Sequence, residues 1–433
     1  MSSELILGAV VALPGLVFAL VTMLWLLGAP LKERFVVIVT AITYSVAVLG
    51  VLALFVEMSS QGLQQILASF GNWFKLGAYE FPLILKVDRV SLPFAALTVI
   101  LTGLVGAFSA RYMHREPGFL RFFLLLHLFA FGALVIFTAG SFDLLIAGWE
   151  FVGLTSVLLI AFFHERPDPV SNALRVFAVY RGCDIGLLVG VVVLHHYHDH
   201  VTPGAAALVS LLFLLAASGK SAQFPFSGWL PRAMEGPTPS SAIFYGAISV
   251  HAGAYLMLRT RPYLEMAPQV AVLVVAVGLV TAVLATLVGR ACSDVKTSLA
   301  YASVTQVGVI FAEIGMGWET LALVHICGHA AVRTLQFLRA PSALHEFHQL
   351  HAAAGGELGQ TGSHYEAFLP VAVRARLYRF ALDRAHMDTL LDRIVVAPLV
   401  RVSTLLNRTE YRMEGKPSGA RVVRVPVAGE ADA

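Results

Sequence analysis

The sequence predicts an all-α membrane protein of about eleven transmembrane helices. Hydrophobic residues make up 58% of the 433 residues, and the mean hydropathy is +0.77. Charged residues contribute only 13%, whereas soluble domains hold roughly 25%. Apolar runs of about 18 residues or more recur as far as residue 339, and each can cross a hydrocarbon core of about 30 Å as a helix. These observations exclude a water-soluble globular domain.

The apolar runs follow one another along the chain. The first has no basic leader and is followed by many others, so we expect a permanent span and not a cleaved signal. Inside 204–231, Pro225 removes a backbone N–H and clashes with an earlier carbonyl, while Gly228 and Pro231 loosen the next turn. This span should therefore be broken. The expected spans are 5–27, 35–57, 91–112, 119–138, 141–163, 172–195, 204–231, 239–259, 268–290, 297–316 and 319–338.

The chain changes character after Arg339. The stretch 340–433 is rich in arginine and holds no uninterrupted apolar run of about 20 residues, so we expect no further span there. Within 374–407, apolar residues recur at helix-like spacing among charges, which predicts an amphipathic helix on a membrane surface or against a partner. These apolar residues are Leu377, Phe380, Ala381, Leu390, Leu391, Val395 and Val396.

The distribution of basic residues predicts the orientation. With eleven spans, one side of the membrane receives most of the lysines and arginines of the short loops, together with the C-terminal tail. The opposite side receives the N-terminus and the long 58–90 loop. Because basic loops favour the cytoplasm, we expect the N-terminus outside and the C-terminus inside. The basic side would carry Lys32, Arg34, Arg111, Arg115, Arg166, Arg232, Arg290 and Lys296.

Ionisable residues within the expected spans are candidates for function, because a charge at the bilayer centre costs about 2.5–3.5 kcal/mol or more. Glu150 lies in the middle of 141–163. In the next span, Arg181 and Asp184 are three residues apart and share a face. Lys220 lies beside the break in 204–231, where backbone is tolerated only if protein or water satisfies it. Their opposite charges predict that Glu150 and Lys220 form a coupled pair.

A second group of titratable side chains follows. His325, His329 and Arg333 recur every four residues and share one stripe of a helix. Imidazoles exchange protons near neutral pH and a guanidinium stays charged, so this stripe predicts a proton relay. The other ionisable residues at or near membrane depth are His251, Asp294, Lys296 and Glu313.

Alternatives remain open for these residues. The pairs of opposite charge could simply lock helices together. Two histidines four residues apart also fit a metal site, but Arg333 on the same face would repel a cation, so we expect no metal. The HHYHDH cluster at 195–200 is expected to be a solvated tip. No cofactor is expected, because the three cysteines, Cys183, Cys292 and Cys327, lack the spacing of a ligand set.

Seven blocks of the chain together resemble one family, the antiporter-like proton-conducting membrane subunits. This family includes the largest antiporter-like subunit of complex I, the Mrp antiporter subunits and the membrane subunit of DAB-type inorganic-carbon transporters. The resemblance covers about 84–339, and its most specific block is the one around Lys220. The blocks are LILKVDRVSLPF, ARYMHREPGFLRFF, AGWEFVGLTSVLLIAFF, RVFAVYRGCDIGLL, SGKSAQFPFSGWLPRAMEGPTPSSA, SDVKTSLAYASVTQVG and HICGHAAVRTLQF.

The resemblance implies roles for individual residues. Glu150 matches the glutamate of the family's proton channel, and Lys220 matches its partner lysine on the broken helix. The two stripe histidines match the family's central histidines, while Arg333 stands where a lysine is usual. An arginine can bias a relay but scarcely releases a proton. Tyr245 occupies a place where complex I subunits carry a histidine, and His251 lies nearby.

The resemblance also implies an organisation in inverted five-helix repeats with one broken helix. Complex I relatives continue beyond the histidine helix through further spans, so the second repeat is expected to be curtailed here. We divide the chain into N-terminal helices with an external loop (1–83), an antiporter-like proton-channel domain (84–339) and a cytoplasmic amphipathic tail (340–433).

Two functions are compatible with the resemblance. In the first, the chain is a proton-conducting subunit of a DAB-type complex for uptake of CO2 or bicarbonate, beside a large peripheral protein similar to zinc carbonic anhydrase. In the second, it belongs to a complex I, hydrogenase or Mrp-like assembly, with no redox or catalytic centre of its own. Both imply a bacterial inner membrane, other subunits as partners, protons or sodium as the ion, and no nucleic acid. A remnant with a dead channel is disfavoured because Glu150, Lys220, His325 and His329 are all retained.

Overall fold

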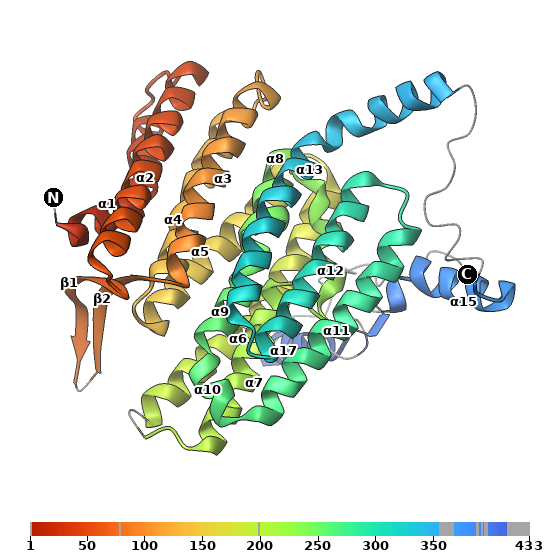
Figure 1. Ribbon diagram of the computed structural model, residues 1–433. Coiled ribbons are helices and arrows are strands. Elements are labelled where there is room, and N and C mark those ends of the chain that lie inside the picture. Colours follow the sequence, from red (N-terminus) through yellow and green to blue (C-terminus); the bar gives the residue numbers. More distant parts are fainter. Residues whose placement is uncertain are drawn as a thin grey trace.

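The computed structural model describes residues 2–77, 79–197, 200–354, 368–386, 389–390, 393 and 397–413. Within this part of the chain, 11 helices are long and apolar enough to cross a membrane, which confirms the all-α membrane fold (Figure 1). The spans are built from α1 (Ser3–Leu26), α2 (Glu33–Gln61), α3 (Ser91–Tyr112), α4 (Phe119–Thr138), α5 (Phe142–Ile160) with η1 (Ala161–Phe163), α6 (Pro167–Tyr197), α7 (Pro203–Lys220), α8 (Thr238–Ser241) with η4 (Ala242–Ala247) and α9 (Ser249–Arg259), α11 (Pro268–Ala291), α12 (Val295–Gly315) and α13 (Glu319–Ala354).

The span made of α8, η4 and α9 lies at the centre of the bundle. All residues of its 18-residue apolar stretch are buried. In the corresponding stretches of α1 and α11, only 28% and 33% of the residues are buried. The pairs α1–α2 and α11–α12 occupy opposite edges in Figure 1. A polar side chain on α9 is therefore shielded from lipid on all sides, while one on an edge helix is not.

Side-chain caps fix where several spans begin. The hydroxyl of Ser141 accepts a hydrogen bond from Leu144 N at the start of α5, and Thr202 does the same for Ala205 N at the start of α7. Asp294 accepts from Thr297 N at 2.7 Å and begins α12. These caps satisfy backbone N–H groups that a helix start leaves without partners, so neighbouring spans can be separated by short turns.

The expected 58–90 loop contains a β-hairpin, which the sequence analysis did not predict. Strands β1 (Gln65–Leu76) and β2 (Tyr79–Asp88) pair antiparallel, with Gln65 opposite Asp88. The side chains of Ile66 and Ala68 alternate into the core beside helix α1, and those of Leu85 and Val87 do so from the other strand. This alternation at period two is a strand signal, but long apolar helices on both sides obscure it.

The central spans are broken in two places. Helix α7 ends at Lys220, and the expected span 204–231 continues only as short turns, η2 (Ser227–Trp229) and η3 (Pro231–Glu235). The next span contains the π-helical turn η4, which the sequence analysis did not anticipate. π-helical turns occur often at functional sites because they redirect side chains and free backbone groups.

The C-terminal region differs from the single amphipathic helix expected over 374–407. Helix α13 continues to Ala354, and the later segments are α15 (Val371–Leu382), η5 (Arg384–His386) and α17 (Ala397–Met413). Helix α15 packs against α11 of the same chain and leaves its arginines exposed. Three of the apolar residues named above, Leu391, Val395 and Val396, lie outside the described residues.

The bundle has two ends, which we name by landmarks. The hairpin end holds Asp88 with its ion-pair partner Arg259, and the short helix α10 (Arg261–Met266) that follows. The turn between α12 and α13 lies at the same end, because Arg261 forms an ion pair with Glu319 at the start of α13. The Lys296 end holds the turn between α11 and α12 and the η3 segment.

Candidate functional site

Lys220 lies at the break of α7, in the centre of the protein. The next residue, Ser221, donates its hydroxyl hydrogen to the carbonyl of Val250 at 2.7 Å, and Trp229 Nε1 donates to the carbonyl of Gly219 at 2.9 Å. Side chains thus satisfy the backbone at and near the break, as buried backbone at membrane depth requires. The same contacts place Lys220 beside the helix that carries His251.

The ammonium group of Lys220 is held by aromatic rings. Its side chain is 1% exposed, and Nζ lies 4.3 Å from the ring centre of Tyr180 and 4.9 Å from that of Trp149. Nζ also donates to the carbonyl of Trp149 at 3.4 Å. Faces of aromatic rings attract a cation, and the attraction is strongest where water is excluded. No sequence pattern marks these two aromatic residues as functional, although Trp149 directly precedes Glu150.

Arg181 links the acidic residues near Lys220. It forms an ion pair with Glu150 of α5 and a second with Asp184, whose Oδ2 lies 2.6 Å from Nη2. Asp184 in turn accepts a hydrogen bond from Trp149 Nε1 at 2.5 Å. The pair of Arg181 and Asp184 expected from their spacing is therefore present. Helix α5 packs against α6, which brings Glu150 within reach of Arg181.

Glu150 and Lys220 form no direct ion pair in the described part of the chain, and the coupling of their charges expected from the sequence stays a prediction. Among the described residues, the ion-pair partner of Glu150 is Arg181. Helix α6 packs against both α5 and α7, so its arginine reaches the carboxylate while Lys220 is held over the rings. The side chains of Glu150 and Arg181 are 39% and 38% exposed, whereas Lys220 is enclosed. The cluster therefore runs from the surface of the chain to its interior.

His251 and His329 form the centre of a second polar cluster. Nδ1 of His329 lies 2.9 Å from Nε2 of His251, and the two rings meet at 80°. The backbone N–H of His251 bonds to the carbonyl of Ile248, and the carbonyl of Ala247 accepts instead from His251 Nδ1. The π-helical turn just before α9 thus frees a carbonyl that binds the imidazole.

These contacts define the protonation pattern of the two rings. A carbonyl can only accept, so His251 Nδ1 carries a hydrogen, and in the neutral ring Nε2 is then an acceptor. His329 Nδ1 must donate to it, which leaves His329 Nε2 without a hydrogen. That nitrogen is buried and has no hydrogen-bond partner in the described part of the protein. It is a free proton acceptor.

His325 lies one turn from His329 on α13, with their ring centres 6.5 Å apart. Its Nδ1 lies 2.9 Å and 3.2 Å from the two carboxylate oxygens of Glu313, and its Nε2 lies 3.0 Å from Oε1 of Gln306. Both ring nitrogens thus face oxygen acceptors. The sequence gives no reason to expect Gln306 at this site, and it indicates no partner for Glu313.

Arg333 continues the stripe towards the Lys296 end. It is 9% exposed, and its Nε has no hydrogen-bond partner among the described residues. A Cβ on Gly246 would lie 3.4 Å from Arg333 Cγ, so this glycine lets η4 and α13 approach closely. Tyr245, the preceding residue, is also buried, and no described residue forms a hydrogen bond with its hydroxyl. In the described residues, no group of three or more His, Cys, Asp or Glu could hold a metal ion.

Two other candidates lie apart from these clusters. Lys296 donates to the carbonyls of Met234 and Gly236, at 2.8 Å and 3.2 Å, and so fastens the end of η3 to α12. In the 195–200 cluster, His195 Nε2 lies 2.9 Å from Asp143 Oδ1, and the contact joins the ends of α6 and α5. His198 and Asp199 lie outside the described residues.

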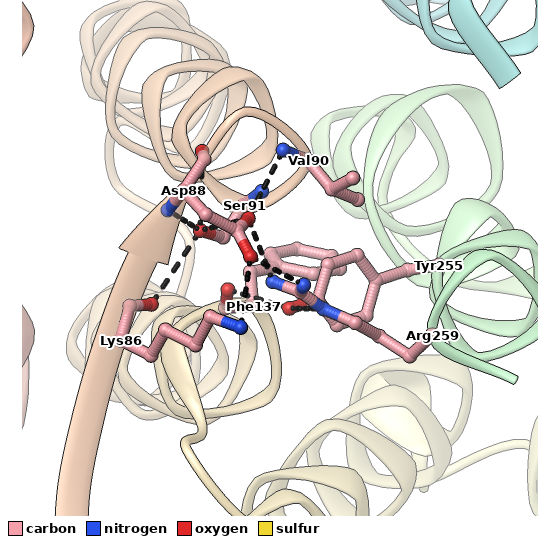
Figure 2. A network of polar contacts seen from close by, with 7 residues as sticks. All are labelled: Lys86, Asp88, Val90, Ser91, Phe137, Tyr255 and Arg259. Carbon is pink, nitrogen blue, oxygen red and sulfur yellow. Dashed lines mark hydrogen bonds and ion pairs between the residues drawn. The ribbon is translucent and has the colours of Figure 1, made fainter. Parts of the chain in front are cut away.

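A clamp at the hairpin end holds the end of α9. Arg259 donates two hydrogen bonds to Asp88, at 2.6 Å and 3.0 Å, and a third to the hydroxyl of Tyr255 at 2.9 Å (Figure 2). That hydroxyl donates to the carbonyl of Phe137 at 2.8 Å. Burial alone raises the pKa of Asp88, but the hydrogen bonds and charge of Arg259 outweigh this effect and hold the pKa below its usual value. The clamp holds α9 at Arg259, which lies eight residues, or about 12 Å along the helix, from His251.

Fold and site together define a polytopic helical membrane protein in which charged, aromatic and histidine side chains are linked through the interior. The chain belongs to the NADH:quinone oxidoreductase/Mrp antiporter transmembrane family, whose model matches residues 139–361, just over half of its 433 residues. A second model, for the N-terminus of NADH-ubiquinone oxidoreductase (complex I) chain 5, matches residues 73–123.

Curated relatives and solved structures agree with this assignment. The chain is 33% identical over 306 residues to NADH-quinone oxidoreductase subunit L of Rhodobacter capsulatus, covering 64% of this chain and 43% of that protein. It is 36% identical over 273 residues to chain 5 of NADH-ubiquinone oxidoreductase from Allomyces macrogynus, covering 60% and 43%. The chain thus spans less than half the length of these relatives.

Two solved structures share the fold. A chain of the Mrp complex from Dietzia sp. matches with a TM-score of 0.67 and 28% identity, covering 76% of this chain and 37% of that one. A chain of the membrane-bound sulfane sulfur reductase, an archaeal respiratory membrane complex, matches with a TM-score of 0.69, covering 78% and 70%. At 21% identity, this second match shows likeness of fold alone.

Proposed function

We propose that this chain conducts protons across a membrane as the ion-translocating subunit of a larger complex. The observation that carries the proposal is the hydrogen-bonded pair of His251 and His329, which lies beside Lys220 and leaves one imidazole nitrogen without a partner among the described residues. Ionisable groups buried in membrane spans are expensive, and they mark ion pathways by default. The family assignment supports the same function.

The ion pairs of Arg181 with Glu150 and Asp184 would control the charge of Lys220. When Glu150 takes up a proton, Arg181 loses one of its two carboxylate partners, and the potential at Lys220 becomes more positive. This change favours release of a proton from Lys220. Because Glu150 is partly exposed on this chain, it is the group that a proton reaches first.

The histidines would receive that proton. Ser221 bonds to the carbonyl of Val250, one residue before His251, so Lys220 and His251 lie at a similar depth. Two other buried groups nearby, the Tyr245 hydroxyl and Gln223 Oε1, have no hydrogen-bond partner among the described residues. Such groups are commonly bridged by water. Water in this region would connect the ammonium group with the imidazoles.

Proton flux into liposomes tests this function directly. The purified chain is reconstituted with a pH-sensitive dye inside the vesicles, and flux is driven by a potassium diffusion potential in sodium-free buffer. We expect flux from the wild type and a loss of at least tenfold in Lys220→Met and Glu150→Gln. Flux that requires sodium would assign the sodium ion instead. Wild-type flux in both variants would contradict the proposed pathway.

For the coupled process, we propose DAB-type uptake of inorganic carbon, with a zinc carbonic-anhydrase-like partner at the Lys296 end. The resemblance of the sequence blocks supports it, and so does a basic surface for an acidic partner. That surface is the exposed side of α15, with Arg374, Arg376 and Arg379. The expected location is a bacterial inner membrane, with this end towards the cytoplasm. The relatives found by comparison favour the alternative, a complex I, hydrogenase or Mrp-like assembly.

Co-purification decides between these assemblies. The chain is extracted from its own cells in a mild detergent, and the proteins bound to it are identified together with their zinc content. A zinc protein that depends on α15 supports carbon uptake, and replacing Arg374, Arg376 and Arg379 with glutamate should release it. Recovery of quinone oxidoreductase or Mrp-type subunits would replace the carbon-uptake proposal with the alternative.

A further inference from the structure

Glu313 lies at the hairpin end, where α12 finishes. It is two residues from the end of that helix, and its backbone carbonyl accepts a hydrogen bond from Trp318 N at 2.9 Å, across the turn into α13. Its side chain is 9% exposed and points to His325 on the neighbouring helix. A carboxylate within one helical turn of the end of a span is close to water.

His325 connects this carboxylate with the central histidines. Its side chain is 22% exposed, compared with 7% for the whole of His329, so it lies between the surface and the interior. Glu313 contacts its Nδ1, and the ring of His329 follows at 6.5 Å. One water molecule can bridge a gap of this size. Polar groups therefore continue from the central pair to the end of α12.

A second route from His251 to the hairpin end, along α9, is blocked by aromatic side chains. The rings of Phe94, Phe137 and Tyr255 contact one another, with ring centres 4.7–5.0 Å apart, and all three are buried. The clamp between Arg259 and Asp88 covers Tyr255 (Figure 2). A cavity of about 450 Å³ lies on the outer side of this clamp and is lined by Tyr255 and Arg259. A buried cluster of aromatic rings opposes the passage of ions.

We propose that Glu313 is the proton-carrying residue at the hairpin end of the pathway, and that His325 passes protons between Glu313 and His329. This inference rests on the proposed function and extends it to a terminal group. In one direction, the Glu313 carboxyl gives its proton to His325 Nδ1, and His325 gives a proton to the free Nε2 of His329 through water. In the other direction the same transfers run in reverse. Each transfer breaks one O–H or N–H bond for each one that it forms: Glu313 takes a replacement proton from the water at that end, and His329 passes its extra proton on through His251 towards Lys220.

Three substitutions test the role of Glu313. Glu313→Gln keeps the size and an oxygen acceptor for His325 but carries no exchangeable acid, so we expect flux to fall at least tenfold. Glu313→Asp keeps the acid and should retain a substantial part of the flux. Glu313→Ala should lose flux and regain part of it when formate, a small weak acid, is added on the hairpin side of the membrane. Glu265→Gln, an exposed carboxylate at the same end, is the control and should conduct normally.

The outcomes separate this inference from the proposed function. If the wild type conducts no protons, the proposed function itself fails. If the wild type conducts and Glu313→Gln conducts equally well, only the role of Glu313 is overturned. Loss of flux in all three variants, with unchanged thermal stability and no response to formate, would also overturn it, because a proton carrier should tolerate an alternative acid.

Discussion

Nδ1 of His329 and Nε2 of His251 lie 2.9 Å apart, although 78 residues separate them in the sequence. The contact joins α13 to α9, the most enclosed span of the bundle. His251 is itself fixed through the carbonyl of Ala247 at the end of the π-helical turn. The two imidazoles therefore form one unit with a defined direction of hydrogen bonding.

A double-substitution experiment tests whether the two histidines act as a unit. We expect His251→Ala and His329→Ala each to lower proton flux at least tenfold, and the double variant to be no worse than either single variant. Groups that work in one step lose their effect together, so their losses do not add. The measurement is the initial rate of dye response in proteoliposomes. Multiplicative losses would mean that the histidines act independently.

Arg333 should be replaceable by another cation. Arg333→Lys keeps a positive charge one turn from His329 and should retain flux, whereas Arg333→Ala should lose most of it. The zinc content of the purified chain is measured in parallel for the wild type, His325→Ala and His329→Ala. We expect no change among the three, because a relay needs imidazole nitrogens that are free to exchange protons. Stoichiometric zinc that disappears in either variant would identify a metal site instead.

Gly153 leaves room for the ammonium group of Lys220. A Cβ at this position would lie 2.9 Å from Nζ, so Gly153→Ala should displace the lysine from its aromatic rings and lower flux by several-fold. Gly182→Ala on α6 is the matched control, since a Cβ there meets nothing within 4 Å. Both variants add one methyl group to a helix. Equal flux in the two variants would mean that the position of Lys220 is unimportant.

The clamp should stabilise the fold. Asp88→Asn weakens two hydrogen bonds between charged groups, and we expect a loss of about 1.5–3 kcal/mol in the free energy of unfolding. Glu80→Gln is the control, because the ion pair of Glu80 with Lys75 is exposed and contributes little. Thermal unfolding in detergent measures both.

The stability that Asp88 provides should depend on pH in one direction. Its pKa is lower in the folded protein than in the unfolded chain, where it is about 3.9, so the contribution is complete above that value. It should disappear as the pH falls further below 4 and the carboxylate is protonated. The unfolding temperature of Asp88→Asn should lack this component. An identical acid profile for the variant and the wild type would contradict the assignment.

Much of the site was predictable because it depends on local spacing. The i, i+3 spacing of Arg181 and Asp184 is enough for their ion pair, and the i, i+4 spacing of His325 and His329 places them on one face of α13. The ion pair of Glu150 with Arg181 was not predictable, for a complementary reason. Several cations lie within reach of one carboxylate, and the packing of α6 between two helices selects Arg181.

The sequence by itself determined the eleven apolar spans, the break near Lys220 and the ionisable residues at membrane depth, because hydropathy and proline act on the chain locally. Only the tertiary structure decided which groups meet. The pairing of His251 with His329 and the clamp of Asp88 with Arg259 join residues 78 and 171 positions apart, and the contact of Glu313 with His325 joins two consecutive helices. Such contacts depend on how helices pack and rotate against one another, and a single sequence carries no local signal for that.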